Sequence, residues 1–152
     1  MFPTNKFMGK FAIKSAVHLF LIKNGNILLL RRANTGYEDG NYIVPAGGLD
    51  EDESVTMATA REAREEADII VDPKNLKMVH VMHRTKDDGG RIDFFFTTDK
   101  WEGEPRIAEP HKCDDMNWFP LNALPQNVVP YVKFALEKSN QGITFSEFEW
   151  EV

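Results

Sequence analysis

The sequence is poor in cysteine and in positive charge, and each shortage excludes a class of site. Cys113 is the only cysteine among 152 residues, so the chain can form no internal disulfide and no cysteine-rich zinc site. We interpret Cys113 as a small buried thiol. The net charge of −6 disfavours a surface for long nucleic acid, because such a surface needs a basic stripe to neutralise phosphates.

Long hydrophobic runs and a secretory leader are also missing. The longest apolar stretches, such as residues 16–22 and 27–30, have strand length and are too short to span a bilayer. Residues 1–14 carry charges but have no long apolar run and no small-residue cleavage site. We therefore expect a cytoplasmic protein that does not associate with membranes.

The length and the apolar pattern predict one domain over residues 1–152, with strands and helices interspersed. Apolar segments at residues 13–22 and 26–31 flank Asn24-Gly25, a dipeptide suited to a tight hairpin turn. Further strands are predicted from similar runs, with a turn at residues 87–90 between two of them, and they cover residues 41–44, 78–85, 91–98 and 116–120. The tail, residues 143–152, is either a last strand or an ordered extension.

Two helices are predicted. Ser54 is a suitable N-cap for residues 55–67, which contain strong helix formers without glycine or proline, and Asp68 tolerates a left-handed exit. A second helix is expected at residues 128–138, with Pro130 in its first turn. Helices on opposite sides of a mixed sheet would give an α/β/α sandwich, although the pattern alone does not select that topology.

Three carboxylates share one face of the first predicted helix. Glu62, Glu65 and Glu66 are spaced i, i+3 and i+4, and their repulsion would be relieved by Mg²⁺, which prefers carboxylate and water oxygens. A solvated acidic helix face is the structural alternative. The opposite side carries small residues that would let the helix pack closely on a sheet, namely Thr56, Ala60, Ala63 and Ala67.

Residues 47–69, GGLDEDESVTMATAREAREEADI, set these carboxylates at fixed distances from a glycine and an arginine. The arrangement resembles the Nudix box, and Asp68 stands where that pattern has its last glycine; the matching positions are Gly47, Glu53, Arg61, Glu62, Ala63, Glu65, Glu66 and Ile69. The polar and glycine matches would arise by chance with a probability on the order of 10⁻⁷. The resemblance implies the Nudix fold, an α/β/α sandwich around a mixed β-sheet.

The resemblance also implies roles for the box residues. Mg²⁺, with Mn²⁺ as the alternative, would be bound by the carbonyl of Gly47 and by Glu62, Glu65 and Glu66. The catalytic set would comprise Glu62, Glu65, Glu53 and Arg61. Glu62 is the first candidate for the general base, although another box carboxylate could take that role. Arg61 could also pair with Glu65 in an ordinary structural ion pair.

Features outside the box resemble the MutT-like branch of the family. The segment at residues 101–105, followed by Glu109 and Trp118, is similar to the part of those enzymes that adds one more acidic metal ligand, and Glu109 is the match. Arg32 resembles a basic residue that contacts the substrate phosphate or base. Asn127 lies near the position of a base-reading asparagine, with an ordinary loop asparagine as the alternative.

The resemblance implies hydrolysis of a nucleoside diphosphate linked to a group X. We favour a nucleoside or deoxynucleoside triphosphate, including oxidised purines, cleaved to monophosphate and pyrophosphate. Arg84 stands where ADP-ribose pyrophosphatases of the family often have a proline, and residues 85–87 stand where dinucleoside polyphosphate hydrolases tend to have a tyrosine, so neither marker is present. The Pro-Ala-Gly start of the box, in contrast, is common among ADP-sugar hydrolases. An ADP-ribose or nucleotide-sugar pyrophosphatase, a non-catalytic nucleotide-binding module and an interaction module that uses the aromatic tail remain alternatives. The tail could instead pack on its own core or on a second subunit, which leaves a homodimer open.

Overall fold

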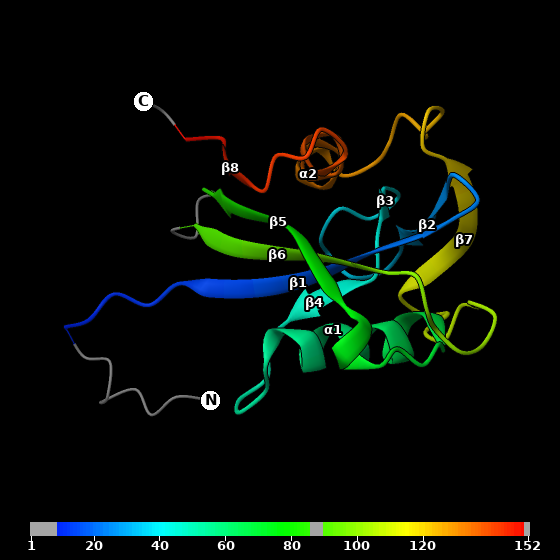
Figure 1. Cartoon of the computed structure of the whole chain (residues 1–152), viewed down its shortest axis with the longest axis horizontal. Coiled ribbons are helices and arrows are strands. Elements are labelled where there is room, and N and C mark those ends of the chain that lie inside the picture. The colour runs from blue at the N-terminus through cyan, green and yellow to red at the C-terminus, as the bar shows by residue number, and fades with distance from the viewer. Residues whose placement is uncertain (1–8, 86–89, 151–152) are drawn as a thin grey trace.

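The computed structural model describes residues 9–85 and 90–150. Strands and helices alternate along them as shown in Figure 1. In chain order the elements are β1 (Lys14–Lys23), β2 (Asn26–Arg32), β3 (Tyr42–Ile43), β4 (Ala46–Gly48), α1 (Val55–Ala67), the 3-10 helix η2 (Pro73–Asn75), β5 (Lys77–Arg84), β6 (Arg91–Thr98), β7 (Cys113–Pro120), α2 (Pro130–Asn140) and β8 (Phe145–Phe148).

The sheet is mixed and is organised around β1. This strand runs parallel to β6 and antiparallel to β4, while β5 pairs antiparallel with β6 and parallel with β8. The far end of β1 pairs with β2, which in turn pairs with β3 and β7. The turn between β1 and β2 has φ values of 53° at Asn24 and 76° at Gly25, which confirms the predicted tight hairpin.

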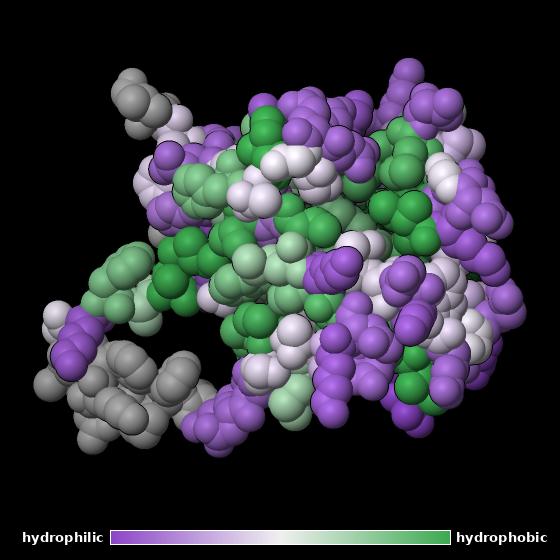
Figure 2. Space-filling model, viewed as in Figure 1, coloured by the Kyte–Doolittle hydropathy of each residue, from purple (hydrophilic) through white to green (hydrophobic). Residues whose placement is uncertain are grey.

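The two α-helices cover opposite faces of the sheet (Figure 1), and hydrophobic residues gather between these layers on the face that Figure 2 shows. Because side chains alternate along a strand, β1 supplies Phe20 to the core under α2, and Leu19 and Leu21 to the core under α1. Ala63 and Ala67 of α1 are fully buried in that second core, as predicted. These layers confirm the α/β/α sandwich around a mixed sheet.

Helix α1 has the predicted bounds and caps. The Ser54 hydroxyl accepts a hydrogen bond from the amide of Met57 at 3.2 Å. Asp68 has a left-handed backbone, with φ 54° and ψ 39°, and its amide donates to the carbonyl of Arg64 at 3.1 Å. These caps fix where the helix starts and stops, and therefore the direction of its acidic face.

Other boundaries differ from the expectation. Residues 46–48, expected as loop, form β4 against β1, because a short run with two glycines carries too weak a pattern to indicate a strand. The second helix begins at Pro130, since a residue before proline is driven to extended backbone, and Val129 has ψ 125°. β7 begins earlier than predicted, at Cys113, and the tail forms β8. The turn expected at residues 87–90 lies almost wholly outside the described residues.

The packing face of α1 agrees in part with the sequence-based prediction. Ala60 is partly buried and packs against the core under α1, as predicted, and Thr56 is partly buried. Ala58 and Thr59, which were not predicted to pack, are fully buried. Within residues 9–85 and 90–150, no helix has the length and apolar character needed to cross a bilayer.

Candidate functional site

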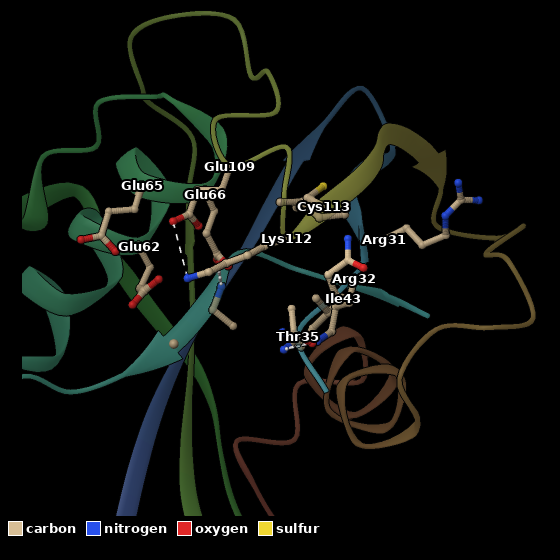
Figure 3. A pocket seen from close by; sticks show the side chains of 14 residues that line it. Arg31, Arg32, Thr35, Ile43, Glu62, Glu65, Glu66, Glu109, Lys112 and Cys113 are labelled. Atoms are coloured by element: carbon tan, nitrogen blue, oxygen red, sulfur yellow. Dashed lines mark hydrogen bonds and ion pairs between the residues drawn. The ribbon is translucent and has the colours of Figure 1, made fainter. Parts of the chain in front are cut away.

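A cavity of about 490 Å³ lies where α1, β4, the end of β2 and the loop before β7 meet (Figure 3). We call it the acidic cavity, because all five predicted metal ligands line it: Gly47, Glu62, Glu65, Glu66 and Glu109. Arg32 and Lys112 also line it, so cations face the same space. The cavity thus joins oxygen ligands for a divalent cation to basic groups suited to phosphate.

The α1 carboxylates differ in burial. Glu65 is the most open, with 49% of its side chain exposed, whereas Glu62 keeps only 13%. Burial raises the pKa of Glu62 to about 7, against the opposing effect of its bond to Arg61. Burial likewise raises the pKa of Glu66 to about 8, although its Oε2 accepts a 2.9 Å hydrogen bond from the amide of Ala46. These groups therefore need a proton or a cation to balance their charge.

Arg61 is the ion-pairing centre of the box. It donates from Nε to Glu53 Oε2 at 2.8 Å and from Nη1 to Glu62 Oε1 at 2.7 Å. The predicted pair with Glu65 is present at 3.2 Å, and Nη2 donates to the carbonyl of Gly48 at 3.0 Å. Arg61 thereby ties α1 to β4 and orients the carboxylate of Glu62.

Glu53 lies behind Arg61 and does not line the acidic cavity. The hydrogen bonds from Arg61 lower its pKa to about 2, and its Oε1 also accepts from the amide of Asp50 at 2.8 Å. The structure therefore brings Glu53 to the arginine of the box, one step removed from the space in which a ligand could sit.

Gly47 lets the Glu62 carboxylate approach the backbone. A Cβ built at Gly47 would lie 2.8 Å from Oε2 of Glu62 and closer still to Oε1 and Cδ. Its strand neighbour Gly48 has no such constraint, because the nearest atom to a Cβ there is the carbonyl oxygen of Ser15 at 4.0 Å. A side chain at Gly47 would therefore displace the Glu62 carboxylate.

The loop before β7 brings Glu109 to the α1 carboxylates. Two amides of this loop donate to the end of α1, from Ala108 to the carbonyl of Glu66 at 3.3 Å and from Arg106 to that of Ala67 at 3.0 Å. The charge of Glu109 contributes to the raised pKa values of Glu62 and Glu66. The structure therefore brings the distant loop and the box together.

The two predicted substrate residues lie in different places. Arg32 lines the acidic cavity, and its guanidinium is held by the carbonyl of Tyr37 at 2.6 Å and the hydroxyl of Thr35 at 3.0 Å. Asn127 is exposed and is not among the residues that line the acidic cavity; its side chain donates to the carbonyl of Gly40 at 2.8 Å. Asn127 thus braces the chain beside β3.

Lys112 is a basic residue of the acidic cavity that the sequence did not lead us to predict. Its Nζ lies 3.9 Å from Oε2 of Glu109, and Figure 3 shows its side chain reaching toward the carboxylates. Lys112 lies three residues after Glu109, and this spacing was the feature of the sequence that could have indicated an ion pair between them. Arg31, the neighbour of Arg32, instead points away from the carboxylates in Figure 3 and pairs with Asp114 at 2.7 Å.

The donor set fits a hard divalent cation in its chemistry. Carboxylate and carbonyl oxygens suit Mg²⁺ and Mn²⁺, and the buried carboxylates carry charge that a cation would offset. In the part of the chain that the structure describes, no three His, Cys, Asp or Glu side chains are already grouped as a metal site. The basic partners of two carboxylates explain why they are not grouped, because Glu62 is turned to Arg61 and Glu109 faces Lys112. A cation would compete with these two basic side chains.

Known proteins share both the sequence pattern and the fold. The chain is 31% identical over 111 residues to an ADP-ribose pyrophosphatase from Methanocaldococcus jannaschii, an alignment that covers 73% of this chain. The chain spans 64% of the length of that relative.

Solved structures show the same arrangement of elements. A MutT NUDIX hydrolase from Burkholderia pseudomallei matches with a TM-score of 0.77 and 26% identity, over 84% of this chain and 98% of that one. The NUDIX domain of NrtR from Shewanella oneidensis, solved in complex with ADP ribose, matches with a TM-score of 0.66 and 18% identity, over 94% of this chain and all of that one. The latter likeness shows the fold alone.

The family assignment rests on the match along the sequence. The family model of the NUDIX domain covers residues 13–137, from β1 to the last turns of α2, and includes the whole box. With this match over most of its 152 residues, the chain belongs to the Nudix family.

Proposed function

We propose that the protein hydrolyses a nucleoside diphosphate linked to a group X, with Mg²⁺ or Mn²⁺ bound among the carboxylates of the acidic cavity. The observation that carries this proposal is the meeting of Glu62, Glu66 and Glu109 in one cavity with Arg32 and Lys112. Anionic phosphates would otherwise be repelled by such a cluster, so the carboxylates make sense only with cations between them and the substrate.

The residues divide the work of the reaction. Mg²⁺, when bound there, would supply positive charge that offsets the phosphate oxygens and would lower the pKa of water. Glu62, or another carboxylate of the box, accepts the proton of the attacking water. Arg61 orients Glu62 through their 2.7 Å hydrogen bond, and Glu53 orients Arg61. Arg32 and Lys112, which line the same cavity, hold phosphate oxygens.

We take the substrate to be a nucleoside or deoxynucleoside triphosphate, oxidised purines included, which yields monophosphate and pyrophosphate. The similarity to a MutT NUDIX hydrolase supports this choice. ADP-ribose is the second candidate, because the relative from Methanocaldococcus jannaschii is named an ADP-ribose pyrophosphatase. A nucleotide-binding domain without catalysis is the third alternative.

One panel of substrates separates these functions. The protein is mixed with nucleoside triphosphates, oxidised dGTP, ADP-ribose and dinucleoside polyphosphates, each with Mg²⁺, with Mn²⁺ and with EDTA, and the products are resolved by ion-exchange chromatography. Metal-dependent release of monophosphate and pyrophosphate from a triphosphate supports the proposal. Turnover of ADP-ribose alone moves the substrate to the second candidate. Binding of nucleotide by calorimetry without any turnover would overturn the enzymatic function.

The setting of the activity is proposed with it. We infer one catalytic domain that works in the cytoplasm on small nucleotides, without long nucleic acid or a membrane. Phe145 and Trp150 leave 56% and 40% of their surfaces exposed at the β8 edge, which favours a homodimer through the tail. Light scattering after gel filtration measures the mass, and a monomer at micromolar concentration would exclude that dimer.

A further inference from the structure

A second cavity, of about 180 Å³, adjoins the acidic cavity. The two share Arg32, Ile43, Ala46 and Gly47, so a ligand held at the carboxylates can extend from one into the other. We call the second one the inner cavity. Whole-ligand pockets usually measure about 300 Å³ or more, so this space suits a single ring system attached to a ligand whose charged part lies elsewhere.

Arg84 lines the inner cavity and is almost completely buried, with 4% of its side chain exposed. Its Nε donates to Oδ2 of Asp93 at 2.5 Å, and its Cζ lies 3.7 Å from the centre of the Tyr131 ring. The guanidinium is therefore fixed along one edge and against one face. Its Nη1 has no hydrogen-bond partner in the described structure, although it is buried. A buried donor without a partner is costly and calls for an acceptor.

Arg84 and Tyr131 also line a smaller cavity of about 80 Å³ on the side of β8. None of the residues that line this smaller cavity also lines the acidic cavity, so a ligand held at the carboxylates cannot extend directly into it. The inner cavity is the one that a substrate of the acidic cavity can reach. A substrate of the acidic cavity could therefore reach Arg84 only through the inner cavity.

Among the described residues, arginines and no carboxylates line the inner cavity, but the charge of Arg84 itself is balanced. Asp93, fully buried, balances Arg84. His18 is also buried and neutral at physiological pH, because burial lowers its pKa to about 4. Its Nδ1 donates to the carbonyl of Phe94 at 3.3 Å, which leaves Nε2 to accept from the hydroxyl of Tyr131 at 3.0 Å. Because Asp93 already balances Arg84, a neutral acceptor suits Nη1 better than a phosphate, whose place is beside the basic residues of the acidic cavity.

We propose that Arg84 sets the base preference of this protein by donating a hydrogen bond from Nη1 to the exocyclic carbonyl oxygen of a nucleobase in the inner cavity. The inference rests on the proposed function, since it takes the phosphates to lie in the acidic cavity. Guanine, hypoxanthine and uracil carry such an oxygen, whereas adenine and cytosine carry an amino group at the matching position. Keto bases are thus accepted, and an amino group placed against the cationic donor is rejected.

Nucleotides that differ at one group test this preference. We expect kcat/KM for GTP and ITP to exceed that for ATP by about tenfold to a hundredfold, as for one charged hydrogen bond, and UTP to exceed CTP likewise. ITP is the informative member, because it keeps the carbonyl of guanine and lacks its 2-amino group. Equal kcat/KM for ITP and ATP would overturn the role of Arg84 while leaving the hydrolase in place.

A binding measurement keeps the inference separate from catalysis. If no triphosphate is hydrolysed, the proposed function fails, and calorimetry with GMP, IMP and AMP still reports on the inner cavity. We expect IMP and GMP to bind at least about tenfold more tightly than AMP. Equal affinities, or no binding of any monophosphate, would overturn the assignment of the inner cavity.

Variants of Arg84 tie the preference to its free nitrogen. Arg84→Lys keeps a cation beside Asp93 but removes the second nitrogen, so the GTP to ATP ratio should fall to within about threefold of unity. Arg64→Lys, on an exposed arginine that lines neither cavity, should keep the ratio of the unmodified protein. An unchanged ratio in Arg84→Lys contradicts the proposal. Should that variant fail to fold, the pair Arg84→Met and Asp93→Leu removes both buried charges and should lose the preference in the same way.

Discussion

Replacement of Gly47 by alanine is expected to damage the acidic cavity without unfolding the protein. The new Cβ would lie 2.8 Å from Oε2 of Glu62 and nearer to the rest of the carboxylate. Ordinary contact begins at about 3.5 Å, so the carboxylate must retreat by roughly 1 Å. A misplacement of that size can cost about a hundredfold in rate, and we expect kcat/KM to fall by about that factor.

The cost in stability should be much smaller than the cost in rate. The displaced atoms are the end of a flexible side chain, and the loss is the 2.7 Å hydrogen bond between Arg61 and Glu62, worth roughly 1 kcal/mol. Arg61 keeps its bonds to Glu53 and to the carbonyl of Gly48. For a domain of this size the corresponding decrease in Tm is about 2–4 °C.

Gly48→Ala is the matched control, because a Cβ there meets nothing closer than 4.0 Å. Steady-state turnover of the best nucleotide gives kcat/KM for both variants, Mn²⁺ titration followed by paramagnetic resonance gives the metal affinity, and thermal melting gives Tm. The reasoning is refuted if Gly47→Ala keeps kcat/KM within threefold of the unmodified protein. It is equally refuted if Gly48→Ala loses as much activity.

Three other changes separate the roles of single residues. Glu62→Gln should lower kcat by about 10²- to 10⁴-fold at unchanged Tm, and exposed Glu137→Gln is the control. Near-normal turnover in the folded Glu62→Gln variant would remove Glu62 from the mechanism. Glu109→Gln should weaken Mn²⁺ binding about tenfold or more, whereas exposed Glu104→Gln should not. Equal Mn²⁺ affinities of these two variants would show that the loop does not contribute a metal ligand. The folded-state pKa of His18, about 4, lies below its unfolded value of 6.5, so its contribution to stability is complete above pH 6.5 and is lost as pH falls toward 4. The raised pKa values of Glu62 and Glu66 change stability in the opposite direction over the same pH range, so the effect of His18 is measured as a difference between variants. The free energy of unfolding of the unmodified protein minus that of His18→Leu, from urea melts, should drop by about 3 kcal/mol across that window, with exposed His111→Gln as the control. Parallel curves for His18→Leu and the unmodified protein would contradict the assignment.

The local part of the site could be predicted from the sequence. Helix α1 has the expected bounds, the expected cap at Ser54 and the expected left-handed exit at Asp68, because each is determined by residues within one or two turns. The same short range fixes the three carboxylates of α1 on one face. The approach of Glu109 was also expected, but that expectation came from a resemblance between whole segments.

The long-range contacts could not be predicted from spacing. Whether Asn127 reaches the acidic cavity depends on how the chain after β7 passes beside β3. In the structure its side chain instead donates a hydrogen bond to the carbonyl of Gly40. The buried pair of Arg84 and Asp93 joins different strands, β5 and β6, across their hairpin. A charge inside the apolar run of β6 was a usable signal, since a buried aspartate must find a cation, although the sequence did not identify which one.

The loop that carries Glu109 also completes the end of α1, and this double use limits how the chain can change in length. Arg106 and Ala108 donate their amides to the last carbonyls of the helix, and Glu109 follows at once. Surface loops usually accept insertions and deletions, but one residue added or removed between Arg106 and Glu109 would move the carboxylate or leave a helix carbonyl without a donor. Length variation should instead be tolerated at residues 103–104, where the loop is exposed.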